Sequence, residues 1–199
     1  FVLAPMERKE QLKPLLATFF SELLFTSLAV AKTEPGARLR RPTWFLLDEF
    51  CNIGQIPNFA NFLTVSRGHG IGLVLGVQSR SQLADVYGEE DAQTIENACA
   101  TYLVYPRIGP DDAEWLSRIL GETTVVTSSR SWEPGDLFAK RSQSESRRRL
   151  MTADEIRALE KDHIFVLAGT RRPVLLKQCR WYQQPQWQHI QPAELEEFA

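Results

Sequence analysis

Short, almost wholly apolar runs alternate in this chain with segments whose apolar residues recur every three or four positions. The run TWFLLD, at 43–48, precedes a helical pattern at 57–68, and IGLVLGVQ, at 71–78, precedes another at 89–99. The series continues with a strand at 100–106, a helix at 110–121 and a strand at 122–128. Strands that are apolar on both faces need helices on both sides, which crossover connections supply. The sequence therefore predicts an α/β fold, a mostly parallel sheet with flanking helices.

A long helix is predicted over residues 7–32, where leucine and phenylalanine recur at three- and four-residue steps. Its most apolar part, LLFTSLAVA at 23–31, is shorter than the roughly 18 apolar residues that a membrane-spanning helix needs. We therefore expect no transmembrane segment in this chain. The opening residues 1–14 have the pattern of a strand end that runs into a helix, so we expect a fragment whose N-terminal part is absent.

The alternation is interrupted at 129–149, where SRSWEPGDLFAKRSQSESRRR is rich in serine and charge and has almost no apolar spacing. This composition predicts a mobile surface loop. A helix should follow, because Thr152 and Glu155 have the spacing of a capping box. Two further strands flank the turn TRRP at 170–173, and a polar tail covers 185–199.

Charge and cysteine usage exclude several classes of protein. The formal net charge is −2 and the pI about 6.0, so a protein that coats DNA with its whole surface is excluded. The three cysteines lack a CxxC pair and favour reduced thiols in the cytoplasm (Cys51, Cys99 and Cys179). The histidines are scattered and are interpreted as ordinary surface or core residues (His69, His163 and His189).

Two adjacent carboxylates, Asp48 and Glu49, end the first apolar strand. An apolar strand that ends in Asp-Glu is the Walker B pattern, in which the Asp holds Mg²⁺ and the Glu orients or deprotonates the attacking water. The alternative is the acidic first turn of an ordinary helix. The residues of this stretch alone leave both readings open.

The next strand and the segment before it supply two further candidates. Gln78 ends the strand at 71–78, where a parallel pairing would place it beside Asp48 and Glu49 and within reach of a γ-phosphate. Arg67 lies among glycines at a helix end, as an arginine finger that acts on a neighbouring subunit would. An arginine that complements the helix dipole is the alternative for Arg67.

Taken together, these motifs resemble the coupling proteins of type IV secretion and conjugation, of the TraG/TraD/TrwB kind. The resemblance rests on LLDEF at 46–50, SRGHG at 66–70, QSRSQL at 78–83 and the segment at 87–95, and extends loosely to RPVLLKQCRWY at 172–182. These relatives are hexameric RecA-like ATPases. The resemblance implies a RecA-like P-loop NTPase fold, of which residues 1–199 form the C-terminal portion.

The resemblance also implies roles for the four candidates. Asp48 would be the metal ligand for Mg²⁺ and Glu49 would act on the water. Gln78 would sense the γ-phosphate, and Arg67 would be a finger that acts in trans. The implied cofactors are ATP and Mg²⁺ in the full-length protein.

One feature of the family is missing from this sequence. No GxxxxGK[ST] motif occurs, and none of the six lysines follows a glycine. The Walker A loop that cradles phosphates is therefore absent from this chain, and the residues that bind the nucleotide are unknown. We therefore expect this chain alone to bind ATP poorly and to lack ATPase activity.

The resemblance implies partners as well. They are DNA, relaxase and relaxosome proteins and components of the secretion channel, with a homo-hexamer at the cytoplasmic face of the bacterial inner membrane. A local excess of positive charge at the end of 129–149 offers a candidate nucleic-acid contact, with a solvated loop as the alternative (Lys140, Arg141, Arg147, Arg148 and Arg149).

Two other functions remain open on the sequence. A non-hydrolysing RecA-like interaction module would bind a secretion or relaxosome partner and keep the two acids only as capping residues. Another RecA-like motor that pumps DNA would also end a strand in acids. The long match beyond the Walker B strand favours the coupling protein over another motor, whereas a GxxxxGK[ST] motif upstream in the complete protein would favour it over the interaction module.

Overall fold

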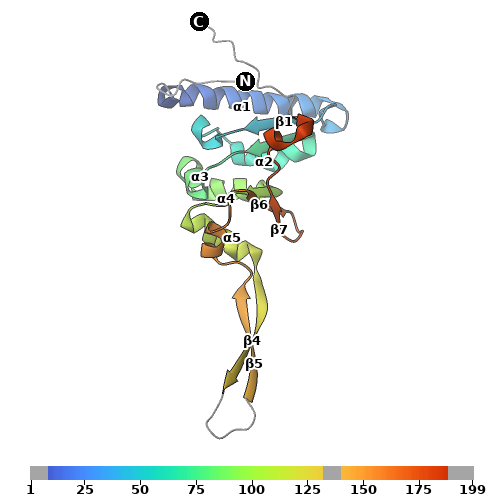
Figure 1. Ribbon diagram of the computed structural model, residues 1–199. Helices are drawn as coiled ribbons and strands as arrows, with labels where there is room; N and C mark the ends of the chain where they lie inside the picture. The colour runs from blue at the N-terminus through green and yellow to red at the C-terminus, as the bar shows by residue number, and fades with distance from the viewer. Residues whose placement is uncertain (1–8, 132–139, 188–199) are drawn as a thin grey trace. The chain divides into compact units, whose positions relative to one another are not determined.

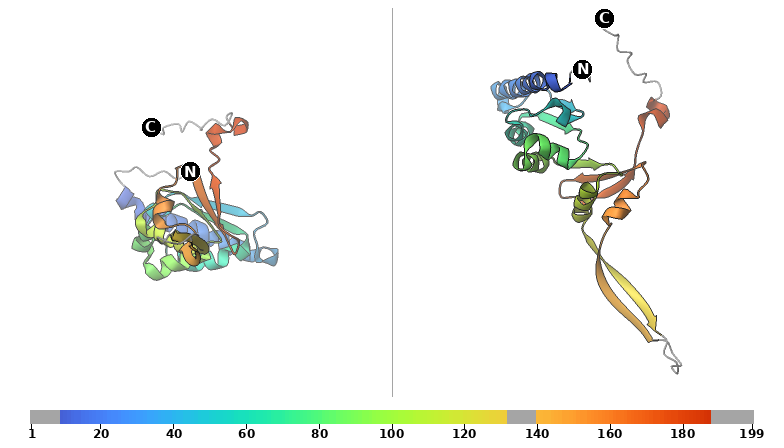
Figure 2. Two further views of the ribbon diagram at one scale, coloured as in Figure 1. Left: turned by 60° about the horizontal axis from the view of Figure 1, so that its bottom comes forward. Right: turned by 90° about the vertical axis from the view of Figure 1, so that its left-hand side faces the viewer.

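The computed structural model describes residues 9–131 and 140–187 (Figures 1 and 2). The chain divides into two compact units, residues 1–100 and 101–199, which we describe separately. The predicted tail at 185–199 lies mostly outside the described residues, as do residues 132–139 of the predicted loop.

The first unit contains one parallel strand pair and four helices among its described residues (Figure 1). The strands β1 and β2 pair in register from Thr43↔Ile71 to Leu47↔Leu75, and α1 packs on α2, which packs on α4. The elements are α1 (Lys9–Thr33), β1 (Thr43–Leu47), α2 (Phe59–Ser66), β2 (Ile71–Leu75), α3 (Arg80–Tyr87) and α4 (Glu89–Ala98). Three short 3-10 turns lie between them: η2 (Pro35–Ala37), η3 (Phe50–Ile53) and η4 (Arg67–His69).

Aromatic packing holds the segment after β1 in the core of the first unit. The ring of Phe50 stacks on that of Tyr87 with 5.3 Å between centroids and lies 4.7 Å from that of Phe59. The Tyr87 hydroxyl accepts a hydrogen bond from the N–H of Ile56 over 3.2 Å. These contacts join η3, α2 and α3 and fix the backbone directly after the first strand.

Helix α3 was not predicted as a separate element. Its N-cap is Ser79, whose hydroxyl accepts a hydrogen bond from the N–H of Gln82 over 3.1 Å. The helix ends before Gly88, which has φ 78°. The serine N-cap and the glycine after the last turn are ordinary helix boundaries and were present in the sequence. The segment between them is short and has few apolar residues, so its periodicity is weak.

The strands of the first unit are covered on one face, whereas the sequence predicts two covered faces. Phe45 and Leu47 of β1 pack in the core cluster, but Trp44 and Leu46 are 63% and 73% exposed. The indole of Trp44 lies over Gly72, its register partner, where a Cβ would come within 2.6 Å of the ring. The open face therefore carries its own apolar contact between neighbouring strands.

Helix α1 is long and apolar enough to cross a membrane, judged by length and composition, over Glu10–Thr33 with a mean hydropathy of 1.6. The sequence-based expectation of no such segment considered only its most apolar part. In this structure the buried residues Leu24 and Leu28 join the core of the first unit. The core helix of a soluble protein meets the same criterion of composition, but only 22% of the apolar window of α1 is buried inside the structure.

The second unit has antiparallel strands, so the predicted parallel arrangement is wrong for it. A three-stranded sheet has the order β3-β6-β7, and a separate two-stranded ribbon joins β4 and β5. The elements are β3 (Thr101–Val104), α5 (Pro110–Leu120), β4 (Glu122–Ser131), β5 (Lys140–Arg149), α6 (Ala153–Arg157), β6 (His163–Ala168), β7 (Val174–Lys177), η5 (Trp181–Gln183) and η6 (Pro185–Trp187). Alternation along a sequence indicates element types, but it does not specify which strands pair or in which direction.

The prediction of a mobile loop at 129–149 is wrong for the residues that the structure describes, 129–131 and 140–149, which are strand residues. Residues 122–131 and 140–149 form a long ribbon in which Glu122 pairs with Arg149 and Ser131 with Lys140 (Figure 1). Residues 122–126 and 145–148 of this ribbon are exposed, and a two-stranded ribbon stabilised by its backbone ladder needs no apolar alternation. The signal on which a strand prediction depends was therefore missing from this segment.

The turn and helix predictions for the second unit are confirmed. Thr152 and Glu155 form the capping box at the start of α6, with the Thr152 N–H donating to Glu155 over 2.9 Å and the Glu155 N–H to the Thr152 hydroxyl over 3.3 Å. The turn at 170–173 joins β6 to β7 as a hairpin. Buried Ile156, Leu116 and Phe165 form the core of this unit.

Candidate functional site

The first strand ends in a backbone corner that exposes two carboxylates. Asp48 and Glu49 follow β1 directly and are both exposed. Two main-chain hydrogen bonds hold the corner to the end of β2: Gly76 N–H donates to the carbonyl of Leu47 over 2.9 Å, and Phe50 N–H donates to the carbonyl of Gly76 over 2.8 Å. The parallel pairing thus continues past both strands and fixes the position of Asp48.

Glu49 adopts a left-handed backbone conformation, with φ 50° and ψ 46°. This conformation costs a residue with a side chain about 1–2 kcal/mol, so neighbouring contacts must offset it. The N–H of Glu49 donates to Asp48 Oδ1 over 3.0 Å, and its carbonyl accepts from Asn52 N–H over 2.7 Å. The Asn52 side-chain amide donates to Glu49 Oε2. The two carboxylates are therefore oriented by local hydrogen bonds.

Gly76 allows the close approach of β2 to Asp48. A Cβ at position 76 would lie 2.9 Å from Asp48 Oδ1 and 3.3 Å from the N–H nitrogen of Glu49. Real Cβ atoms essentially never approach other atoms so closely, so any side chain here would displace the carboxylate. Gly76 and Asn52 were missed from the sequence, where their only signal was a position next to a strand end.

The third polar candidate, Gln78, lies at the same end of the strand pair. Since Leu47 pairs with Leu75, Asp48 is level with Gly76, and Gln78 follows two residues later. Gln78 is exposed, and its N–H donates to Gln82 Oε1 over 3.4 Å at the start of α3. The carboxyl ends of β1 and β2 therefore present Asp48, Glu49 and Gln78 along one edge.

Arg67 lies at the opposite end of the strand pair. It begins η4, just before β2, where the carbonyl of Gly70 accepts from the N–H of Thr43 at the start of β1. Five-residue strands span roughly 13 Å, so the strand pair itself separates Arg67 from Asp48. Within one chain the structure does not bring this exposed arginine to the two carboxylates.

A buried thiol lies directly behind the acidic corner. Cys51 belongs to η3 and to the core cluster, and burial raises the pKa of its thiol. Burial likewise raises the pKa of Tyr87, whose hydroxyl accepts from Ile56. Both groups are therefore neutral near pH 7 and provide packing behind the carboxylates.

The basic residues of β5 are partly engaged in ion pairs. Arg148 pairs with Glu155, and Arg149 pairs with Glu114 over 2.7 Å and also donates to the Ser117 hydroxyl over 3.2 Å. Arg147 is exposed and forms no ion pair with any residue that the structure describes. The side chains of the two remaining candidates lie outside the described part of the chain (Lys140 and Arg141).

Comparisons with known proteins identify relatives over most of the chain. The chain is 27% identical over 165 residues to the conjugal transfer protein TraG of Rhizobium radiobacter. This aligned segment covers 81% of this chain and 26% of that protein. It is 22% identical over 174 residues to the protein VirD4 of Agrobacterium fabrum, covering 87% and 26% of the two chains. The chain thus spans about a quarter of the length of these curated relatives.

Solved structures agree with these relatives. The bacterial conjugative coupling protein TrwBdeltaN70, in complex with sulphate, matches with a TM-score of 0.66 and 28% identity over 87% of this chain and 38% of that one. TrwB in complex with ADP and Mg²⁺ matches with a TM-score of 0.61 and 27% identity over 84% and 37%. These likenesses confirm the predicted α/β, RecA-like fold class.

The family described as "Type IV secretory system Conjugative DNA transfer" matches residues 1–197, nearly the whole chain. The family resemblance predicted from the Walker B strand and its neighbours is confirmed by this match. The chain belongs to the type IV secretory system conjugative DNA transfer family.

Proposed function

We propose that this chain is part of an ATP-driven coupling protein that brings DNA, bound to its relaxase, or protein substrates to a type IV secretion channel. The observation that carries the proposal is the corner at the carboxyl end of β1, where Asp48 and Glu49 are held against Gly76. Ligands of open α/β sheets bind at the carboxyl ends of the strands. The family match and the nucleotide complexes of TrwB support the same assignment.

In this proposal, Asp48 holds Mg²⁺ directly or through water. Its Oδ1 already accepts the N–H of Glu49, and the exposed carboxylate keeps its second oxygen for a hydrated ion. Carboxylate oxygens are suitable ligands for this hard cation. Bound Mg²⁺ would neutralise charge that develops on the ATP phosphates.

Glu49 is proposed to orient or deprotonate the attacking water, because its carboxylate is exposed and its position is set by Asn52. Gln78, on the same edge, would hydrogen-bond the γ-phosphate or its water. The chain has no GxxxxGK[ST] motif, so we propose that another part of the complete protein holds the phosphates. This chain alone is then expected to be inactive.

Arg67 is proposed to act on the nucleotide of a neighbouring subunit. Its place at the opposite end of the β1–β2 pair removes it from the carboxylates of its own chain. An exposed arginine followed by Gly68 and Gly70 is well suited to reach a second chain, and such a contact requires a ring such as a homo-hexamer. We further propose that this assembly lies at the cytoplasmic face of the bacterial inner membrane.

The test is DNA-stimulated ATPase activity of the complete protein. Glu49→Gln should lower kcat at least about 100-fold while nucleotide still binds, and Arg67→Ala should lower it about 1,000-fold or more. Matched controls are Glu89→Gln at the exposed start of α4 and Arg41→Ala, which remove the same groups elsewhere in the first unit. Unchanged turnover in both site variants would reject the roles of Glu49 and Arg67, and an absence of turnover in the wild-type complete protein would favour a non-hydrolysing interaction module.

A further inference from the structure

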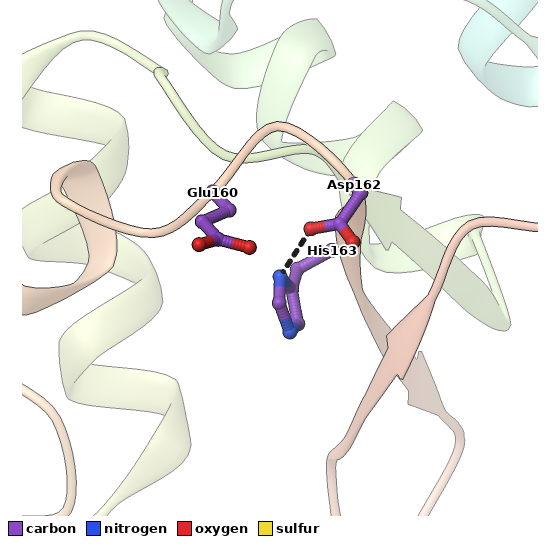
Figure 3. A group of neighbouring side chains, drawn as sticks. All are labelled: Glu160, Asp162 and His163. Carbon is purple, nitrogen blue, oxygen red and sulfur yellow. Dashed lines mark ion pairs between the residues drawn. The ribbon is translucent and has the colours of Figure 1, made fainter.

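A cluster of three side chains in the second unit has the composition of a metal site. Glu160, Asp162 and His163 each offer one ligand atom, and these atoms all lie within 4.8 Å of one another. Figure 3 shows the two carboxylates pointing toward the imidazole of His163. From the sequence, His163 was predicted to be an ordinary histidine, because the three residues match none of the common metal-binding spacing motifs.

The backbone brings the three side chains together in a tight turn. His163 N–H donates to the carbonyl of Glu160 over 3.2 Å, which closes the turn just as β6 begins. Gln178, at the end of β7, holds this turn from the other strand. Its N–H donates to the carbonyl of Asp162 over 2.6 Å, and its side-chain amide donates to the carbonyls of Lys161 and His163 over 2.7 and 3.0 Å. The positions of the three ligands are therefore fixed before any ion binds.

Two of the three donor atoms are buried and lack a hydrogen bond. Asp162 Oδ1 and His163 Nδ1 are inaccessible to solvent and have no hydrogen-bond partner in the described part of the chain. They lie 2.8 Å apart and form an ion pair with each other when His163 is protonated (Figure 3), and the His163 and Asp162 side chains are 22% and 41% exposed. A cation bound between them would satisfy both atoms when His163 is neutral, in place of their mutual contact.

The spacing of these two atoms fits neighbouring ligands of one ion. Donors separated by 2.8 Å subtend about 84° at an ion roughly 2.1 Å from each. This angle is close to the one of about 90° in an octahedron, whereas a tetrahedral site would need the donors about 3.4 Å apart. Imidazole nitrogen favours a transition metal, and two carboxylates suit a six-coordinate one whose other positions hold water.

The charges around the cluster favour a divalent cation. Besides His163, the ion-pair partner of these carboxylates among the described residues is Lys177, whose Nζ lies 3.9 Å from Asp162 Oδ2 and whose side chain is 76% exposed. Lys177 thus contacts the oxygen that points away from His163 and leaves Oδ1 available. We propose that Glu160, Asp162 and His163 bind a divalent first-row transition-metal ion that links the turn before β6 to the β6–β7 hairpin. This site is separate in sequence from Asp48 and does not depend on nucleotide hydrolysis.

The test is titration of the chelator-treated chain with Mn²⁺, followed by calorimetry and by loss of the free-ion signal in electron paramagnetic resonance. One saturable site per chain is expected, together with a melting temperature that rises with Mn²⁺ concentration, because the ion binds the folded turn. His163→Ala and Glu160→Gln should each weaken binding at least about tenfold. Asp154→Asn, an exposed carboxylate of α6, is the matched control and should leave the affinity unchanged.

A gain of affinity tests the proposal without a risk to folding. Lys177→Gln removes the competing cation beside Asp162 and should tighten Mn²⁺ binding several-fold. Lys32→Gln removes the same charge from exposed α1 and should have no effect. An absence of saturable Mn²⁺ binding, equal affinity in the wild type and His163→Ala, or unchanged affinity in Lys177→Gln would each overturn the site.

Discussion

Gly76 lies so close to Asp48 that a Cβ at position 76 would come within 2.9 Å of Asp48 Oδ1. The contact joins the ends of β1 and β2, since Gly76 also exchanges main-chain hydrogen bonds with Leu47 and Phe50. The absence of a side chain at position 76 therefore determines where the proposed magnesium ligand lies.

We predict that Gly76→Ala lowers the ATPase activity of the complete protein. The added methyl group must displace the Asp48 carboxylate or the backbone of Glu49, and overpacking of this kind costs about 1–3 kcal/mol. ATPase activity at several Mg²⁺ concentrations should show a raised Mg²⁺ requirement. Gly109→Ala is the control, since nothing lies within 4 Å of a Cβ at that position. An active Gly76→Ala variant with wild-type Mg²⁺ dependence would contradict the role of Asp48.

Asn52→Ala should lower kcat about tenfold with little change in KM, because a hydrogen bond to a charged group is worth about 1.5–3 kcal/mol. Its side-chain amide donates to Glu49 Oε2 and so orients the proposed base. The measurement is steady-state ATPase kinetics of the complete protein. Asn61→Ala, at an exposed position of α2, serves as the comparison. Equal kcat values for the two variants would show that Glu49 needs no such support.

Tyr87→Phe should destabilise the folded chain by about 1–3 kcal/mol, because it leaves the buried N–H of Ile56 without a partner. Ring stacking on Phe50 is retained in this variant, so the loss measures the hydroxyl's two hydrogen bonds, one from the Ile56 N–H and one to the Gly54 carbonyl over 3.5 Å. Chemical denaturation followed by circular dichroism measures the effect. Tyr105→Phe, at an exposed position, should change stability very little. A similar loss in both variants would count against the hydrogen bond.

The stability of the second unit should fall in acid through Glu155. Hydrogen bonds from the Thr152 backbone and from Arg148 hold the pKa of Glu155 below its ordinary value. A lowered folded-state pKa contributes stability above the unfolded-state pKa of about 4.3, and this contribution is lost as pH falls through the folded-state value.

The measurement is the melting temperature between pH 7 and pH 3. Glu155→Gln keeps a side-chain acceptor for the capping box but has no carboxyl group to titrate, so its melting temperature should depend less on pH in the acid range. Glu145→Gln, at an exposed position of β5, should keep the wild-type profile. A steeper acid transition in Glu155→Gln would have the wrong sign for this mechanism.

Local signals in the sequence determined the element types and several boundaries. The capping box of Thr152 and Glu155, the turn at 170–173 and the long amphipathic helix all follow from the spacing of nearby residues. The acidic strand end at Asp48 was also recognisable, because an apolar run and two carboxylates are adjacent in the chain. Such features depend on contacts between residues a few positions apart.

Only the tertiary structure decided which distant residues meet. Strand pairing brings Gly76 to Asp48, places Arg67 at the far end of the same pair and turns a charge-rich segment into the β4–β5 ribbon. The β6–β7 hairpin likewise holds the turn that brings Glu160 to His163. Pairing direction and register arise from backbone hydrogen bonds and packing across the whole unit, and the spacing of residues along one strand does not encode them.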